Sequence, residues 1–121
     1  MNEEILKTVE EILLEKISKK ETITYSELAV QINKKLKRKA VPEKGKVLGT
    51  VLSKYLHSLC QEYFQKERIM IGAIIVRKDS GIPSSGFFEF AEKLYKLKLN
   101  TKKQKNEFWE SEIKKIFKEK R

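Results

Sequence analysis

The stretch TYSELAVQINKKLKRKAVPEKGKVLGTVLSKYL, residues 24–56, places two helical patterns on either side of a basic loop. Its first four residues, Thr24 to Glu27, form a capping-box sequence, in which two side chains satisfy the free amides that begin a helix. Apolar residues then recur at helical spacing as far as Leu36, and again from residue 46 into the sixties. The positions expected to face inward in the second helix are Val47, Leu48, Val51, Leu52, Tyr55 and Leu59. The stretch therefore predicts a helix-turn-helix.

Flanking patterns predict further helices and two short strands. Apolar residues at helical spacing predict a helix from Glu3 to Lys19. Segments 21–24 and 68–76 are rich in β-formers, and the second has no alternation, which predicts a central buried strand. Serines 84–85 are expected to cap another helix through their side chains, and an amphipathic terminal helix is expected at about 105–120.

The predicted fold class follows from this order of elements. It is mainly α with a small antiparallel sheet, a winged helix-turn-helix with two extra C-terminal helices. We expect one domain over residues 1–121, with a core at about 1–99.

The net charge of +10 directs attention to a polyanionic partner. Residues 1–22 sum to −2, whereas residues 23–46 sum to +5 and residues 100–121 to +4. A lysine-rich composition also follows from an AT-rich genome, so charge alone leaves both explanations open. The longest apolar run is far shorter than the roughly 20 residues of a membrane span. An acidic N-terminal segment and a single cysteine predict no export signal, no disulfide framework and a cytoplasmic location.

Three segments resemble a known family. ITYSELA, residues 23–29, is similar to the opening of the DNA-binding domain of O6-alkylguanine-DNA alkyltransferases and alkyltransferase-like proteins. KVLGTVL, residues 46–52, resembles that family's recognition helix, and AIIVRKDSG, residues 73–81, falls where the family carries its reactive cysteine motif. The resemblance covers residues 20–82 and implies a winged-helix scaffold and DNA binding. GIPSSGFF, residues 81–88, also resembles small prokaryotic proteins of mobile-element or defence neighbourhoods.

The chain departs from the family at the reactive positions. Aligned on Gly81, the family's cysteine, histidine and arginine fall on Ala73, Ile74 and Ile75. Lys46 replaces the arginine that the family inserts into the DNA stack. A thiolate nucleophile needs sulfur and a neighbouring base, so the resemblance implies the scaffold without the alkyl-transfer reaction.

The candidate nucleic-acid-binding residues lie on the outer face of the helix after the basic loop, in that loop, and in the turn after residue 76. Small polar and basic residues on a helix allow it to enter a major groove, while basic loops meet phosphates. The candidate set is Lys37, Arg38, Lys39, Lys44, Lys46, Thr50, Ser53, Lys54, His57, Arg77 and Lys78. The alternative for these residues is an ordinary solvated surface.

No catalytic, metal-binding or cofactor-binding set is expected. His57 has no second ligand at metal spacing, and Cys60 fits a small buried hydrophobe at the edge of the inner face. The serines at 84–85 lack the GxSxG or SxxK context of a nucleophile. Asp79 and Glu89 do not form a strand-borne acidic cluster. The predicted function is non-catalytic binding of nucleic acid, with duplex DNA as the expected partner and no membrane contact.

The alternative function is a protein–protein adaptor, either a homodimer or a subunit of a larger prokaryotic complex. Phe87, Phe88 and Phe90 cannot all be buried on one helical face, so at least one is expected to be exposed or to lie against the first or the last helix. Exposed phenylalanines, together with Trp109 and Phe117, would make an apolar interface. An enzyme such as a nuclease is a third class, for which the sequence offers no set of residues.

Overall fold

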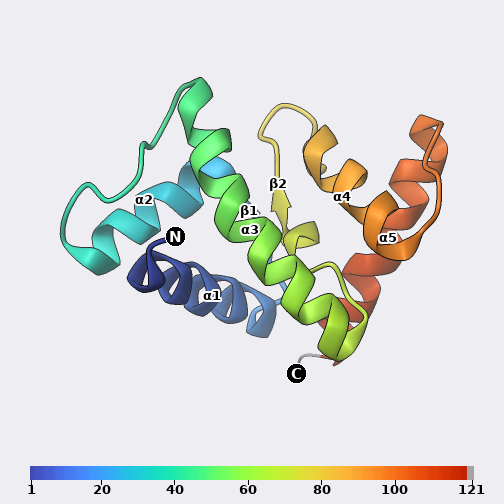
Figure 1. Cartoon of the computed structure of the whole chain (residues 1–121), viewed down its shortest axis with the longest axis horizontal. Coiled ribbons are helices and arrows are strands. Elements are labelled where there is room, and N and C mark those ends of the chain that lie inside the picture. The colour runs from blue at the N-terminus through green and yellow to red at the C-terminus, as the bar shows by residue number, and fades with distance from the viewer. Residues whose placement is uncertain (120–121) are drawn as a thin grey trace.

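A computed structural model describes residues 1–119 and is mainly helical, with 69% helix (Figure 1). The helices of this part of the chain are α1 (Glu3–Ser18), α2 (Tyr25–Leu36), α3 (Lys46–Glu67), α4 (Ser85–Tyr95) and α5 (Lys102–Glu119). Two short strands, β1 (Ile23–Thr24) and β2 (Ile75–Val76), and a 3-10 helix, η1 (Ile71–Ile74), complete the order.

The capping box at the start of α2 is confirmed. The Thr24 hydroxyl accepts a hydrogen bond from the Glu27 amide at 3.2 Å, and the Glu27 carboxylate accepts one from the Thr24 amide at 3.2 Å. At its other end α2 stops at Lys37, which has φ of 57° in the left-handed region. Local chemistry thus fixes the start of α2, and the left-handed residue turns the chain into the basic loop.

The expected antiparallel sheet is wrong, because the two strands pair in parallel. Ile23 is opposite Ile75 and Thr24 is opposite Val76. From β1 the chain passes through α2 and α3 before it returns in β2, and such a crossover brings the second strand back in the same direction. The turn after β2 therefore leads into α4, and residues 77–81 are not the tip of a hairpin between these two strands.

The long buried strand expected at 68–76 is also wrong. Only its last two residues are a strand, and the four before them form η1. The backbone here finds partners other than a strand: the Met70 amide donates to the Glu112 carboxylate at 2.7 Å, and the Gly72 amide donates to the Cys60 sulfur at 3.3 Å. An unbroken apolar run fits a buried strand and a buried helical turn equally well. The sequence pattern of residues 68–76 therefore could not distinguish between them.

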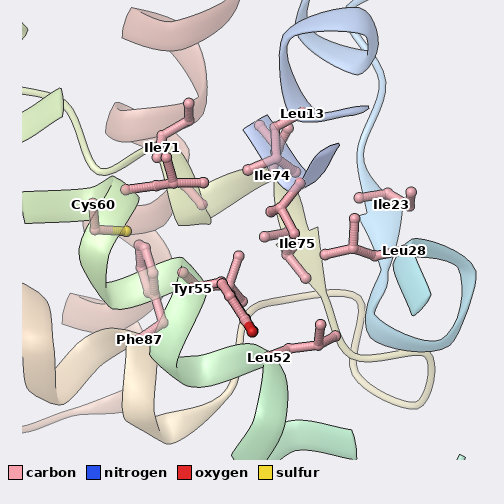
Figure 2. Packing of buried hydrophobic residues seen from close by; sticks show 14 of the residues in the cluster. Leu13, Ile23, Leu28, Leu52, Tyr55, Cys60, Ile71, Ile74, Ile75 and Phe87 are labelled. Atoms are coloured by element: carbon pink, nitrogen blue, oxygen red, sulfur yellow. The ribbon is translucent and has the colours of Figure 1, made fainter. Parts of the chain in front are cut away.

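The core gathers residues from every helix around η1 and β2. Figure 2 shows Ile74 and Ile75 among Leu13 of α1, Leu28 of α2 and Tyr55 of α3, with Cys60, Ile71 and Phe87 grouped beside them. Val47 was expected to face inward, but it is 61% exposed. Of Val47 and Leu48 in the first turn of α3, Leu48 is the residue that is buried, at 6% exposed.

Helix α5 is joined to the rest of the chain by a buried carboxylate. Glu112 is 2% exposed, and besides the Met70 amide it accepts hydrogen bonds from the Tyr95 hydroxyl at 2.9 Å and the Lys115 ammonium at 2.7 Å. Ile116 is fully buried, so α5 contributes to the core. The helix begins at Lys102, earlier than the expected residue 105, and position 120 of the expected range lies outside the described residues.

Candidate nucleic-acid interface

Asn33 holds the basic loop of residues 37–45 in place. Its side chain is 8% exposed, and its oxygen accepts from the amides of Ala40 at 2.8 Å and Val41 at 3.0 Å. Its amide group donates to the Val41 carbonyl at 2.9 Å and to the Glu43 carboxylate at 2.8 Å. One side chain thus satisfies four groups of the loop, which gives the loop a defined shape without regular structure.

Helix α3 carries the next candidates on its outer face. Lys46, Thr50 and Lys54 are exposed, while Ser53 is half-buried and donates its hydroxyl to the Gly49 carbonyl at 2.6 Å. His57 is exposed and stacks on the ring of Phe90, with centroids 4.4 Å apart and planes 15° apart. Partial burial lowers the pKa of His57, and the nearby positive charge of Lys93 lowers it further, so the folded protein favours the neutral imidazole.

The cations of the candidate set fall into two groups. Arg38 forms an ion pair with Glu4, and Arg77 forms one with Asp79 at 2.8 Å. The other basic members are exposed and form no ion pair with any residue that the structure describes. These unpaired cations are Lys37, Lys39, Lys44, Lys46, Lys54 and Lys78.

Two of the candidate segments, the start of α3 and the turn of residues 77–81, lie at the same edge of the view (Figure 1). In Figure 1 the loop of residues 37–45 rises from the end of α2 to the start of α3, and the turn of residues 77–81 reaches the same upper edge. Hydrogen bonds from the Gly81 amide to the Arg77 carbonyl (2.8 Å) and from the Arg77 amide to the Ile82 carbonyl (2.9 Å) close the turn. Gly81 has φ of 75°, which a residue without Cβ adopts at little cost.

A recess of about 360 Å³, counted to include its opening to solvent, lies between α3 and the start of α4. Its polar wall includes Ser53, His57, Tyr25 and Ser84, and Cys60 lies on its apolar side. Ser84 is the N-cap residue of α4, but the expected side-chain cap is wrong: its hydroxyl instead accepts from the Tyr25 hydroxyl at 3.1 Å. The Ser84 side chain therefore makes a tertiary contact with Tyr25 instead of the helix cap that the local sequence pattern predicted.

Cys60 is buried, as expected, with 2% exposed. Burial raises the pKa of its thiol to about 12, so the sulfur is protonated at neutral pH and is not a nucleophile. Over residues 1–119 no three His, Cys, Asp or Glu side chains come together as a metal site. The same residues contain no helix long and apolar enough to cross a membrane.

The aromatic surface expected for a protein partner is wrong at its main positions. Phe87 and Phe88 are 7% and 3% exposed, and Phe90 is half-buried against His57. Trp109 is half-buried and donates its indole N–H to the Ala73 carbonyl at 2.8 Å, and Phe117 is partly buried against the core. Phe87 lies against Phe108 of α5 with ring centroids 6.2 Å apart, so the aromatic side chains of α4 and α5 pack within the chain.

Asn33 and Glu112 are the polar residues that sequence reasoning missed. Both are buried; Asn33 holds backbone amides seven and eight residues away, and Glu112 holds a backbone amide 42 residues away. A signal existed for Asn33, since it lies four residues after the buried Ala29 and therefore on the inner face of α2. Glu112 follows the same logic with Ile116, four residues later.

Comparison with known proteins returned no matching family model, no matching curated protein and no matching solved structure.

Proposed function

We propose that this protein binds double-stranded DNA through α3 and the loop before it, and that it does so without catalysis. The observation that carries the proposal is the set of unpaired lysines around the start of α3. Their positions correspond to the phosphate contacts of a helix-turn-helix, in which the second helix enters the major groove. The resemblance of residues 20–82 to an alkyltransferase DNA-binding domain favours the same partner and a winged-helix-like arrangement.

Alkyl transfer is not part of the proposal. Ala73, Ile74 and Ile75, which stand at the family's reactive positions, are each 0% exposed. They are apolar side chains within the core and offer neither a nucleophile nor a base. We therefore propose that the protein acts by binding DNA, without catalysis, in the cytoplasm.

The geometry also favours nucleic acid over a protein partner. In the described part of this chain, the large exposed apolar residues are Met1, Leu14 and Val47. One lies on the N-terminal segment and one each on α1 and α3. Scattered single residues of this kind do not form a continuous apolar patch. Val47 lies beside Lys46 at the start of α3, where an apolar side chain suits contact with a thymine methyl group.

Fluorescence anisotropy with labelled duplex, single-stranded and hairpin probes over a series of salt concentrations tests the proposal. We expect the duplex to bind with a steep salt dependence, because displaced counterions are released as lysines neutralise phosphates. The variant Lys46→Glu/Lys54→Glu should weaken duplex binding by at least about tenfold and reduce the salt slope by about two. Its melting temperature should not fall, since both side chains are exposed and unpaired.

The matched control is Lys19→Glu/Lys20→Glu. These adjacent lysines are exposed at the end of α1, on the opposite edge of the molecule from the start of α3 (Figure 1). The control changes the net charge by the same amount and should retain most of the affinity. Equal binding by wild type and Lys46→Glu/Lys54→Glu would overturn the docking, and no binding of wild type to any probe would overturn the function.

A further inference from the structure

A second group of cations lies at the beginning of α5, in a segment that the candidate set did not include. Residues 93–105 contain six lysines and no acidic residue. Lys102 and Lys103 are exposed and form no ion pair with a described residue. Lys105 is different, because its ammonium lies 5.9 Å from the centre of the Phe88 ring.

The first turn of α5, which carries these two lysines, lies at the same edge of the view as the start of α3 (Figure 1). In Figure 1 the beginnings of α3, α4 and α5 and the turn of residues 77–81 all lie along the upper edge, while the ends of α1, α3 and α5 lie below. The helix starts that carry Lys46 and Lys102, and the turn that carries Lys78, therefore lie along one edge of this view. A rod with charge along its whole length, such as a duplex, can meet all three.

The start of α5 is held firmly enough to present the charges at a fixed place. The Gln104 amide donates to the Thr101 hydroxyl at 3.1 Å, and the Gln104 side-chain oxygen accepts from the amides of Thr101 at 3.1 Å and Asn100 at 2.8 Å. Further along, Glu112 and Trp109 join the helix to η1 and to the residue before it. The lysines thus stand on an ordered helix rather than on a free tail.

Lys102 and Lys103 lie where a positive charge lowers the stability of α5, and neither forms an ion pair with a described residue that would offset this. The first turn of a helix carries a partial positive charge, which makes a lysine there unfavourable by about 0.3–1 kcal/mol. The first turn of α5 contains no acidic residue to compensate, and α3, which begins with Lys46, shows the same arrangement. Charges kept against the local preference of the helix point to a role outside folding.

We propose that Lys102 and Lys103 are a second phosphate contact, so that the duplex lies along the edge from the start of α3, past residues 77–81, to the start of α5. This inference rests on the proposed function and extends its site. It predicts that full affinity needs a duplex long enough to reach both ends of the edge.

The test compares Lys102→Glu/Lys103→Glu with the Lys46→Glu/Lys54→Glu variant and with the Lys19→Glu/Lys20→Glu control on duplexes of about 12 and about 24 base pairs, roughly one and two helical turns. We expect Lys102→Glu/Lys103→Glu to lose about tenfold or more in affinity for the longer duplex and to show a salt slope smaller by about two. Its melting temperature should stay equal or rise, because glutamate suits the first turn. Lys102→Gln/Lys103→Gln should lie between this variant and wild type.

Each outcome bears on one of the two proposals. If only Lys46→Glu/Lys54→Glu weakens binding, the second contact is overturned and the proposed function stands. If all three double variants weaken binding equally, net charge explains the result and the second contact is also overturned. If wild type binds neither duplex, the proposed function fails first and the second contact with it. Loss of affinity in Lys102→Glu/Lys103→Glu with binding retained in the control supports the inference.

Discussion

Replacing Asn33 with alanine should loosen the basic loop and destabilise the whole protein. The side chain now accepts two backbone hydrogen bonds and donates one to backbone, all within residues 40–41, and a fourth bond reaches Glu43. Alanine provides none of these. The loop has no other regular structure to hold it, so its conformation depends on this residue.

The magnitude follows from which groups lose their partners. Val41 is 2% exposed, so its amide and carbonyl would be left buried and unsatisfied, whereas Ala40 is half-buried and water can reach its amide. At about 1–3 kcal/mol for each of these two buried unsatisfied groups, a loss of about 2–6 kcal/mol in the free energy of unfolding is expected. For a chain of 121 residues this corresponds to a fall of roughly 8–24 °C in melting temperature.

Urea unfolding followed by circular dichroism measures the loss, and hydrogen exchange locates it. We expect the amides of Ala40 and Val41 to lose protection in Asn33→Ala, while the amides in the middle of α3 lose only what the global destabilisation removes. Asn100→Ala is the matched control, since Asn100 is exposed, and should change stability by less than about 0.5 kcal/mol. A loss below about 1 kcal/mol in Asn33→Ala, or unchanged exchange at residues 40–41, would refute the reasoning.

Four further outcomes follow from single residues. Glu112→Gln should lower the free energy of unfolding by about 1–3 kcal/mol in urea titrations, since it replaces a buried charged acceptor that serves three donors; an unchanged midpoint contradicts this. The Cys60 thiol, whose pKa burial raises to about 12, should not react with a thiol reagent at about pH 8 until denaturant is added, and rapid labelling of native protein would show otherwise. Burial, and then the charge of Lys93, lower the pKa of His57 in the folded state, so the unfolded state binds the proton more readily. The free energy of unfolding should therefore fall as the pH drops below about 6.5. His57→Gln should remove this pH-dependent part of the stability when unfolding is measured at several pH values. Gly49→Ala should raise stability by about 0.5–1 kcal/mol, since no atom lies within 4 Å of the added carbon, and a lower melting temperature would be inconsistent with open space there.

Sequence reasoning was most accurate where the evidence is local. The helical spacing of residues 3–19 and the pairing of Thr24 with Glu27 act within a few residues, and both elements form as expected. The basic loop and the exposed positions of Lys46 and Lys54 on α3 also followed from local spacing. The partner and the activity stay predictions, because a basic surface names a class of ligand and not the ligand itself.

Contacts between distant segments decided the rest. Parallel pairing of Ile23 with Ile75 depends on where the chain goes between them, and η1 depends on Glu112 and Cys60 to satisfy its neighbouring amides. The Ser84 hydroxyl likewise accepts a hydrogen bond from Tyr25, which is distant in sequence, instead of capping α4.

The sequence by itself therefore determined the helices, the capping box of α2 and the sign of the surface charge, because these depend on neighbours within one or two helical turns. Only the tertiary structure decided which polar groups are buried, which aromatic residues are covered, and that the starts of α3 and α5 share one edge (Figure 1). A hydrogen bond or a packed ring between residues far apart in sequence leaves no periodic signal, since its partner is set by the path of the whole chain.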